Sequence, residues 1–163
     1  MIRGLALAFA ILAAAPALAA RNDPYEALKA MNGHWIVTGA HGHTETIDNN
    51  CARTGLFFVC EQAVGGKPAA LVIFLPKGHE ERKLTFRTQT LTSAGDRPGP
   101  WRDLTIDGDT WTYADADRPV GAVRKVRTVI THSGPDYMHA EVQATMKGDN
   151  WIVLSSENFN RAR

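Results

Sequence analysis

The sequence contains little cysteine and no excess of either charge, and each of these features argues against certain classes of site or partner. Only two of its 163 residues are cysteines, Cys51 and Cys60, and 18 basic residues stand against 17 acidic ones. No basic block and no acidic tail is present, which argues against nucleic acid and anionic membrane surfaces as partners. Neither Cys nor His occurs at zinc-finger spacing around the cysteine pair.

Sequence motifs of common enzyme classes are also missing. The chain has no serine nucleophile elbow, no Walker loop, no dinucleotide-binding fingerprint and no H-E-x-x-H helix. We therefore predict no cofactor, and we leave open whether the protein is an enzyme.

Long hydrophobic runs are absent except at the start of the chain. Arg3 precedes an apolar run from Leu5 to Ala15, and Ala17-Leu18-Ala19 then supplies the small residues that a signal peptidase requires. We expect residues 1–20 to be a cleaved signal peptide and residues 21–163 to be one exported domain, periplasmic or secreted. The run is too short for a spanning helix and no stop-transfer pattern follows, so no stable membrane anchor is expected after cleavage.

In an exported chain, an even number of cysteines predicts a disulfide. Cys51 and Cys60 flank Thr54-Gly55, a natural turn between two strand-like segments. The spacing is not C-x-x-C, so a structural bridge is favoured over a redox pair or two metal thiolates.

One helix and about ten strands are expected in the mature chain. Asp23 as N-cap and Pro24 at the first helical position predict a helix that continues through Tyr25 to Met31. Short segments rich in β-formers then follow, with Gly, Pro, Asp or Asn at each joint. They span residues 34–39, 44–51, 56–64, 68–75, 84–92, 104–106, 111–113, 123–131, 138–146 and 151–159.

Such regular spacing is typical of an antiparallel meander, and a meander of this many strands avoids two exposed edges by closing. We therefore predict an all-β, closed up-and-down barrel. In residues 138–146, Met138, Ala140, Val142, Ala144 and Met146 share one face, which we interpret as the interior. Residues His139, Glu141 and Gln143 lie on the other face.

Gly33-His34-Trp35, placed directly after the expected helix, resembles the G-x-W motif of lipocalins and the wider calycin superfamily. The overall layout is similar to small bacterial secreted lipocalin-like proteins of unknown function. This resemblance implies that Trp35 lies across the closed end of a barrel under a basic residue, for which Arg161 and Arg163 are candidates. Asp136-Tyr137 is similar to part of the T-D-Y motif, although Gly134-Pro135 replaces what precedes it.

The sequence offers weak candidates for chemistry. His41 and His43 could coordinate one metal ion from the same strand face. The flanking glycines indicate an exposed hairpin tip, however, so no metal site is predicted. Glu157 is expected opposite Ala140, on the apolar side of the sheet. If the protein is an enzyme, the candidate catalytic residues are Glu141, Glu157 and His139, together with Arg127 as a possible ion-pair partner of Glu157. A haem-binding barrel would need a proximal histidine to coordinate the iron, and no sequence feature identifies either His132 or His139 as that ligand.

The function that fits best at this point is binding of a small, mostly apolar molecule inside the barrel. Its candidate lining is Val142, Ala144, Met146, Trp151 and Phe86. One alternative is a barrel cyclase, isomerase or hydrolase that uses interior polar groups, and another is a loop-mediated protein-binding or inhibitor module. The ligand and the oligomeric state stay open.

Overall fold

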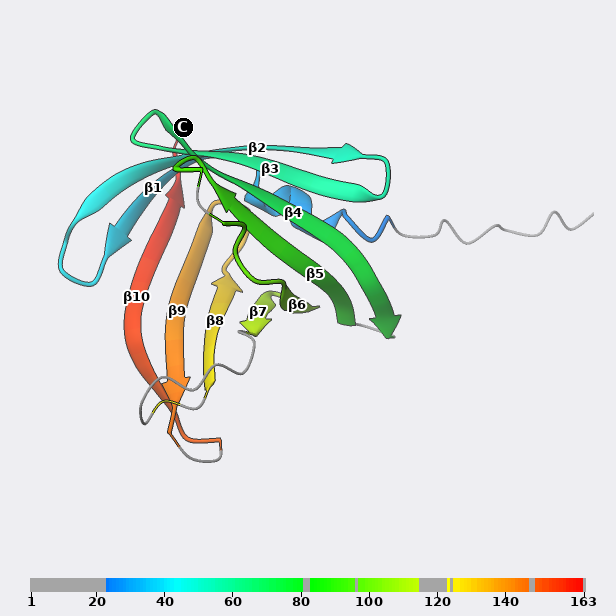
Figure 1. Cartoon of the computed structure of the whole chain (residues 1–163). Coiled ribbons are helices and arrows are strands. Elements are labelled where there is room, and N and C mark those ends of the chain that lie inside the picture. The colour runs from blue at the N-terminus through cyan, green and yellow to red at the C-terminus, as the bar shows by residue number, and fades with distance from the viewer. Residues whose placement is uncertain are drawn as a thin grey trace, which may run out of the picture.

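The computed structural model describes residues 23–80, 83–95, 97–114, 123, 125–146 and 149–162. The expected signal peptide and Arg163 lie outside the described residues. Ten strands pair in chain order, and β1 pairs with β10, so the sheet closes into an antiparallel barrel as predicted (Figure 1). No helix in the described part of the chain is long and apolar enough to cross a lipid bilayer.

The elements follow one another as a meander. After the 3-10 helix η1, Ala27–Met31, come β1 Gly33–Gly39, β2 Thr44–Thr54, β3 Phe57–Val64, β4 Lys67–Glu80, β5 Lys83–Thr92, β6 Arg102–Asp107, β7 Thr110–Ala114, β8 Lys125–His132, β9 Tyr137–Thr145 and β10 Trp151–Arg161.

Two local predictions need correction. The N-terminal helix is a short 3-10 helix rather than the expected helix from Pro24, and the Asp23 carboxylate accepts a hydrogen bond from the Tyr25 backbone N–H in the turn before it. Strand β4 does not end at Pro76 but continues to Glu80. It does so because its register shifts between Pro76 and Gly78, and a bulge tolerates a residue that cannot donate to the ladder.

Glycine sets the tight turn between β3 and β4. Gly65 and Gly66 both have positive φ, 56° and 74°, which fits the two-residue hairpin turn that the sequence predicts. The Cys51–Cys60 disulfide is confirmed, and the two residues are direct cross-strand partners in β2 and β3.

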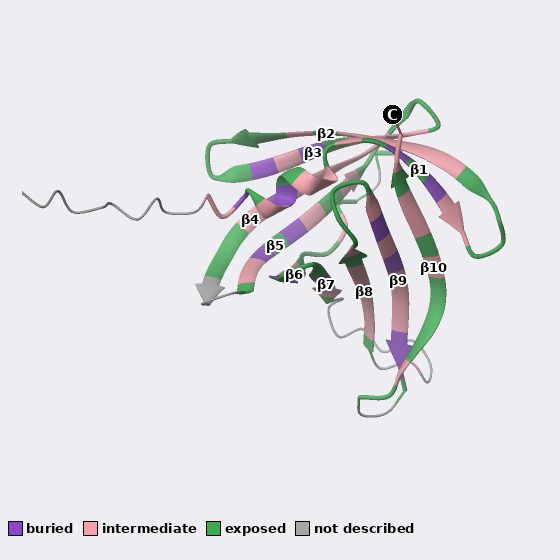
Figure 2. Ribbon diagram, turned by 180° about the vertical axis from the view of Figure 1, so that it is seen from behind, coloured by how far each residue is buried: buried purple, intermediate pink, exposed green. Residues whose placement is uncertain are grey.

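The core lies inside the barrel in two clusters. The larger cluster gathers Tyr25 and Leu28 from the N-terminal segment with inward side chains of β3 to β7. Trp35, Val37 and Met138 form the smaller one, and Ile130 packs against both. Buried and half-buried residues alternate over the first half of β9, from Tyr137 to Glu141 (Figure 2). Met138, Ala140 and Ala144 are buried, as predicted for the inward row.

Candidate ligand-binding sites

Trp35 and Arg161 stack on each other beside the end of η1. Trp35 is 1% exposed, and the Arg161 guanidinium lies 4.2 Å from the centre of its ring. Its indole N–H donates to the carbonyl of Met31 at 3.0 Å. Arg161 donates to the carbonyls of Ala30 and Asn32 at 3.1 and 2.6 Å. These bonds satisfy carbonyls at the end of η1, which would otherwise lack partners.

Gly33 is required by the same contact. A Cβ at this position would lie 2.5 Å from Nη1 of Arg161, and the backbone φ is +117°. The G-x-W motif therefore has a local physical reason in this chain: the glycine admits the arginine that covers the tryptophan.

The predicted ligand-binding residues are scattered. Phe86 is 1% and Ala144 is 0% exposed, and both are part of the packed interior. Val142 faces inward and is half-buried. Met146 follows β9 and is 54% exposed, whereas Trp151 lies outside the barrel and stacks on Arg127, 4.0 Å from ring centre to guanidinium carbon.

The candidate catalytic residues do not meet at one point. Glu157 pairs with Ala140 as predicted and belongs to the inward row, but its side chain is solvent-exposed. Glu141 and His139 lie on the outer face, as the alternation predicts, and Arg127 lies there too. None of the three is therefore an interior polar group of the kind that the enzyme alternative requires.

Those outer residues form a chain of hydrogen bonds. Arg127 donates to Gln143 at 2.8 Å, and Gln143 donates to Glu141 at 2.6 Å. Glu141 lies 3.4 Å from His139, which is 2.8 Å from the amide oxygen of Asn158. Because each side chain has a partner within this chain, the arrangement is that of a surface polar ladder.

Burial shifts the pKa of the titratable interior side chains Tyr25, Tyr113 and His132. Burial raises the pKa of Tyr113, whose hydroxyl lies 4.0 Å from the sulfur of Met31. Burial likewise lowers the pKa of His132, and the Asp109 carboxylate opposes this shift only in part. The His132 ring packs on Trp111 with centroids 4.5 Å apart, and its Nε2 has no hydrogen-bond partner among the described residues.

His41 and His43 flank Gly42 in the exposed turn between β1 and β2. In the part of the chain that the structure describes, no three His, Cys, Asp or Glu residues are placed to hold a metal ion together.

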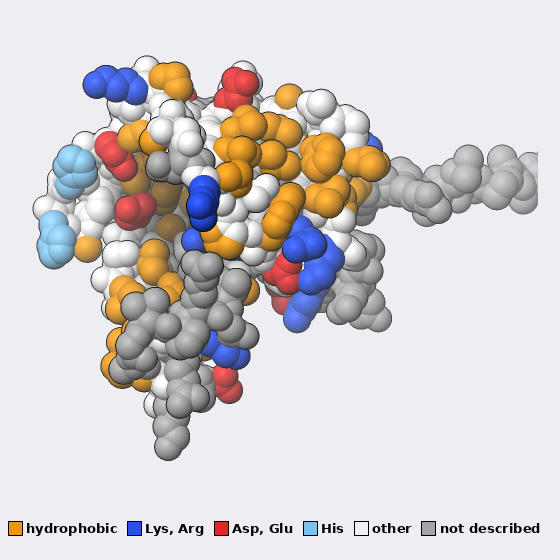
Figure 3. All heavy atoms as spheres, viewed as in Figure 1, with side chains coloured by type: hydrophobic (Ala, Val, Ile, Leu, Met, Phe, Trp, Pro, Cys, Tyr) orange, Lys and Arg blue, Asp and Glu red, His pale blue; other side chains and the backbone are white. Residues whose placement is uncertain are grey.

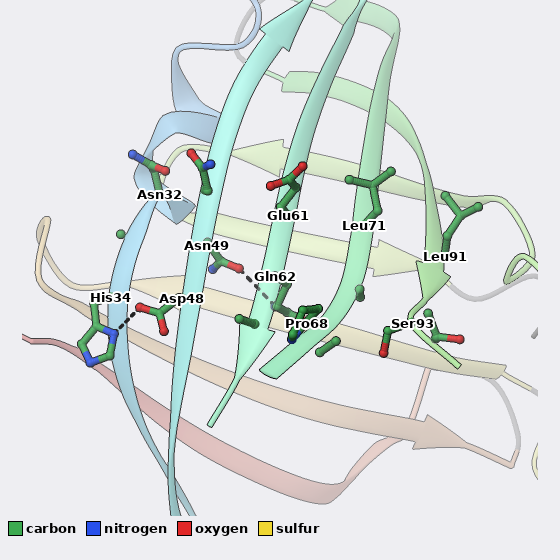
Figure 4. Close-up of a pocket in the computed structure, with 16 residues that line it drawn as sticks. Asn32, His34, Asp48, Asn49, Glu61, Gln62, Pro68, Leu71, Leu91 and Ser93 are labelled. Atoms are coloured by element: carbon green, nitrogen blue, oxygen red, sulfur yellow. Dashed lines mark hydrogen bonds and ion pairs between the residues drawn. The ribbon is translucent and has the colours of Figure 1, made fainter. Parts of the chain in front are cut away.

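A hollow of about 850 Å³, the β1–β5 hollow, lies against one wall of the barrel (Figure 4). Apolar residues supply much of its surface: Ala63, Pro68, Ala69, Ala70, Leu71 and Leu91. None of its lining comes from β6 to β10, so the hollow does not span the interior. On the outer surface, hydrophobic side chains gather over β4 and β5 next to it (Figure 3), and Leu71, Ile73, Leu75 and Leu91 are half-buried there.

Polar groups of both faces of the sheet belong to the lining of the hollow. Asn50 and Glu61 share the outward row with Leu71, whereas Asn49 and Gln62 belong to the inward row. The side-chain amide of Asn49 donates to the Met31 carbonyl at 3.1 Å, and Gln62 donates to Asn49 at 3.2 Å. His34 and Asp48 form a side-chain hydrogen bond at one edge (Figure 4). Sequence analysis missed this hollow; its one signal is the run of small residues at Ala63 and Pro68 to Ala70, whose side chains leave space beside Leu71 and Leu91.

A second hollow of about 640 Å³, the β4–β10 groove, lies on the outer face near the β6 and β10 starts. Its lining includes Lys77, Arg87, Lys125 and Arg127, one carboxylate, Asp103, and the indoles of Trp101 and Trp151. Of the predicted ligand-binding residues, Trp151 lines this groove, and the other four line neither of these two hollows.

No model of a known protein family matches the sequence, and no curated protein is recognisably similar to it. Among solved structures, the chain is similar to the crystal structure of Rv2717c from M. tuberculosis, with 14% sequence identity and a TM-score of 0.47. The alignment covers 86% of this chain and 98% of that one. At this level the likeness concerns the fold alone, and no function is carried over from it.

Proposed function

We propose that the protein binds a small, mostly apolar molecule in the β1–β5 hollow. The observation that carries the proposal is the hollow itself, about 850 Å³, within the range of roughly 300–1,000 Å³ that is usual for small-molecule sites. Its apolar walls supply contact area, and a few polar groups are placed to orient a ligand.

Asn50 and Glu61 are suited to that orienting role, because they share the outward row with Leu71 and Leu91. A ligand that lies on the two leucines would therefore meet an amide and a carboxylate beside it. The positions of the candidate acids favour a binding function over a catalytic one, because Glu141 and Glu157 lie on opposite faces of the sheet.

We also propose that the protein belongs to the calycin superfamily and works outside the cytoplasm. The first point is supported by the guanidinium of Arg161, which lies on the Trp35 ring and beside Gly33, because the family resemblance implies a basic residue over this tryptophan. The apolar segment of residues 1–20 and the Cys51–Cys60 disulfide support the second, because disulfides persist in oxidising compartments.

Nile red, a neutral apolar dye, tests the proposed site. We expect the folded protein to bind about one dye per chain, with increased fluorescence. Leu71→Glu places a charge in the hollow and should weaken binding at least tenfold. Val153→Glu is the matched control, because Val153 is 52% exposed on β10 and does not line the hollow.

A third variant separates the two possible locations. Val142→Trp fills the inward face of β9 and should leave dye binding unchanged if the hollow is the site. Loss of binding in Val142→Trp together with normal binding in Leu71→Glu would move the site to the barrel interior. If no dye binds at all, the carrier hypothesis fails and the protein-binding alternative gains.

A further inference from the structure

The β4–β10 groove has a different chemistry from the hollow described above. Along its floor, Arg87 pairs with Asp103 across β5 and β6, Asp103 pairs with Ala114, and Ala114 pairs with Arg127. Direct cross-strand partners share a face, so these four side chains form one outward row. Because Ala114 is short and the two arginines are long, the row is low in its middle and high at both ends.

Positive charge is concentrated in this groove. The carboxylate of Asp103 is bound by Lys77 at 2.7 Å, and no second acidic residue in the described lining offsets the charges of Lys125, Arg87 and Arg127. The whole chain has a formal net charge of only +1, so this surplus is local. A concave surface with one sign of charge attracts ligands of the opposite sign.

Both guanidinium groups are held on tryptophan faces. Arg127 lies 4.0 Å from the centre of the Trp151 ring, and Arg87 lies 5.4 Å from the centre of the Trp101 ring. Significant cation–π pairs occur about once per 70–80 residues, yet two of them line this one groove of ten residues. A guanidinium that is stacked on a ring keeps its N–H edge available for the oxygens of an anion.

The aromatic rings add a second kind of contact. Trp101 is 38% exposed and Trp151 is half-buried, whereas the other two tryptophans, Trp35 and Trp111, are 1% and 2% exposed. The accessible indoles are thus both in the groove, where they can stack on a planar ligand ring.

From this juxtaposition, we propose that the β4–β10 groove is a binding site for a small aromatic compound that carries two or more negative charges as sulfonate, phosphate or carboxylate. The arginines bind the anionic groups, and the indoles stack on the ring. About 640 Å³ accommodates a molecule of that size. This site is independent of the β1–β5 hollow, and either proposal can fail without the other.

The probe is pyrene-1,3,6,8-tetrasulfonate, titrated by calorimetry against the full folded chain. We expect one saturable site with a Kd below about 1 mM, and weaker binding as salt is raised, because exposed charges are screened. Arg127→Gln and Arg87→Gln should each weaken binding at least fivefold. Arg127→Gln removes the hydrogen bond to Gln143. If that loss prevents folding, the affinity of Arg87→Gln for the probe tests the proposal alone.

Arg53→Gln is the matched control. Arg53 also stacks on an aromatic ring, 4.9 Å from the centre of Tyr25, and its loss removes the same charge at a distant place. Its affinity for the probe should equal that of the parent protein. Equal affinity in the Arg87 and Arg127 variants, or no saturation by the probe, would overturn the proposal.

Two competitors define the ligand class. Sodium sulfate that competes at the same concentration as the probe would overturn the aromatic part of the proposal. Binding of heparin or single-stranded DNA without binding of the tetrasulfonate would assign the groove to a polymer instead. In the Arg87 and Arg127 variants, Nile red binding should be unchanged, which keeps the result separate from that of the β1–β5 hollow.

Discussion

Gly33 shows how one residue position depends on a side chain far along the chain. The missing Cβ leaves room for the Arg161 guanidinium, and the backbone φ of +117° is one that other residues rarely adopt. We predict that Gly33→Ala lowers the free energy of unfolding by about 1–3 kcal/mol, measured by urea denaturation. Gly39→Ala on the same strand should be close to neutral, because its nearest atom would be 3.9 Å away without a positive φ. Equal effects of the two substitutions would show that Arg161 does not need the space.

His132 predicts a pH dependence of stability. Burial lowers its pKa in the folded state, whereas the unfolded chain has a value of about 6.5. As the pH falls below that value, the unfolded state binds more protons than the folded state, so stability decreases. We expect the melting temperature to fall from pH 7.5 to pH 5, and His132→Phe to reduce that fall while it retains the packing on Trp111. His41→Gln, an exposed control, should leave the slope unchanged.

At the scale of elements, the disulfide links β2 to β3 at a direct cross-strand pair. Thiol titration of the unfolded, unreduced protein should find no free thiol. Replacing both cysteines by serine should cost roughly 2–3 kcal/mol on the chain-entropy model for so short a loop. A double variant as stable as the parent would mean that the bridge adds nothing to the pairing of the two strands.

The elements also show where sequence patterns suffice and where they do not. Gly65-Gly66 and the alternation from Met138 to Ala144 predict their turn and strand correctly because both signals are local. The alternation is wrong at the end of the strand, where Thr145 is buried and Met146 is 54% exposed. Pro76 misleads, since its tolerance depends on a bulge opposite β5. The type of the N-terminal helix is hidden for a similar reason: its last carbonyls are bound by Trp35, Asn49 and Arg161, which come later in the chain.

The candidate sites depend on the whole molecule. Whether Ala114 leaves a gap beside Arg127 depends on the registers of three strand pairs, which no short stretch of sequence contains. Sequence analysis identified Arg127 and Trp151 as candidates, but it did not place them together, because they lie on β8 and β10 with β9 between them. Pairing in chain order, by contrast, follows from regularly spaced strands with turn residues between them, and closure follows from the two exposed edges that an open meander would leave. The barrel could therefore be predicted from the sequence.

Closure of the barrel can be tested along β1, where Trp35 to Thr38 pair with β2 on one side and with β10 on the other. Successive residues of an antiparallel strand direct their N–H groups to opposite neighbours. We therefore expect consecutive amides of this segment to exchange slowly with deuterium, all with opening free energies near that of global unfolding. The measurement is native-state hydrogen exchange by NMR. If the seam between β1 and β10 were open, every second amide would exchange fast, and that alternating pattern would contradict a closed barrel.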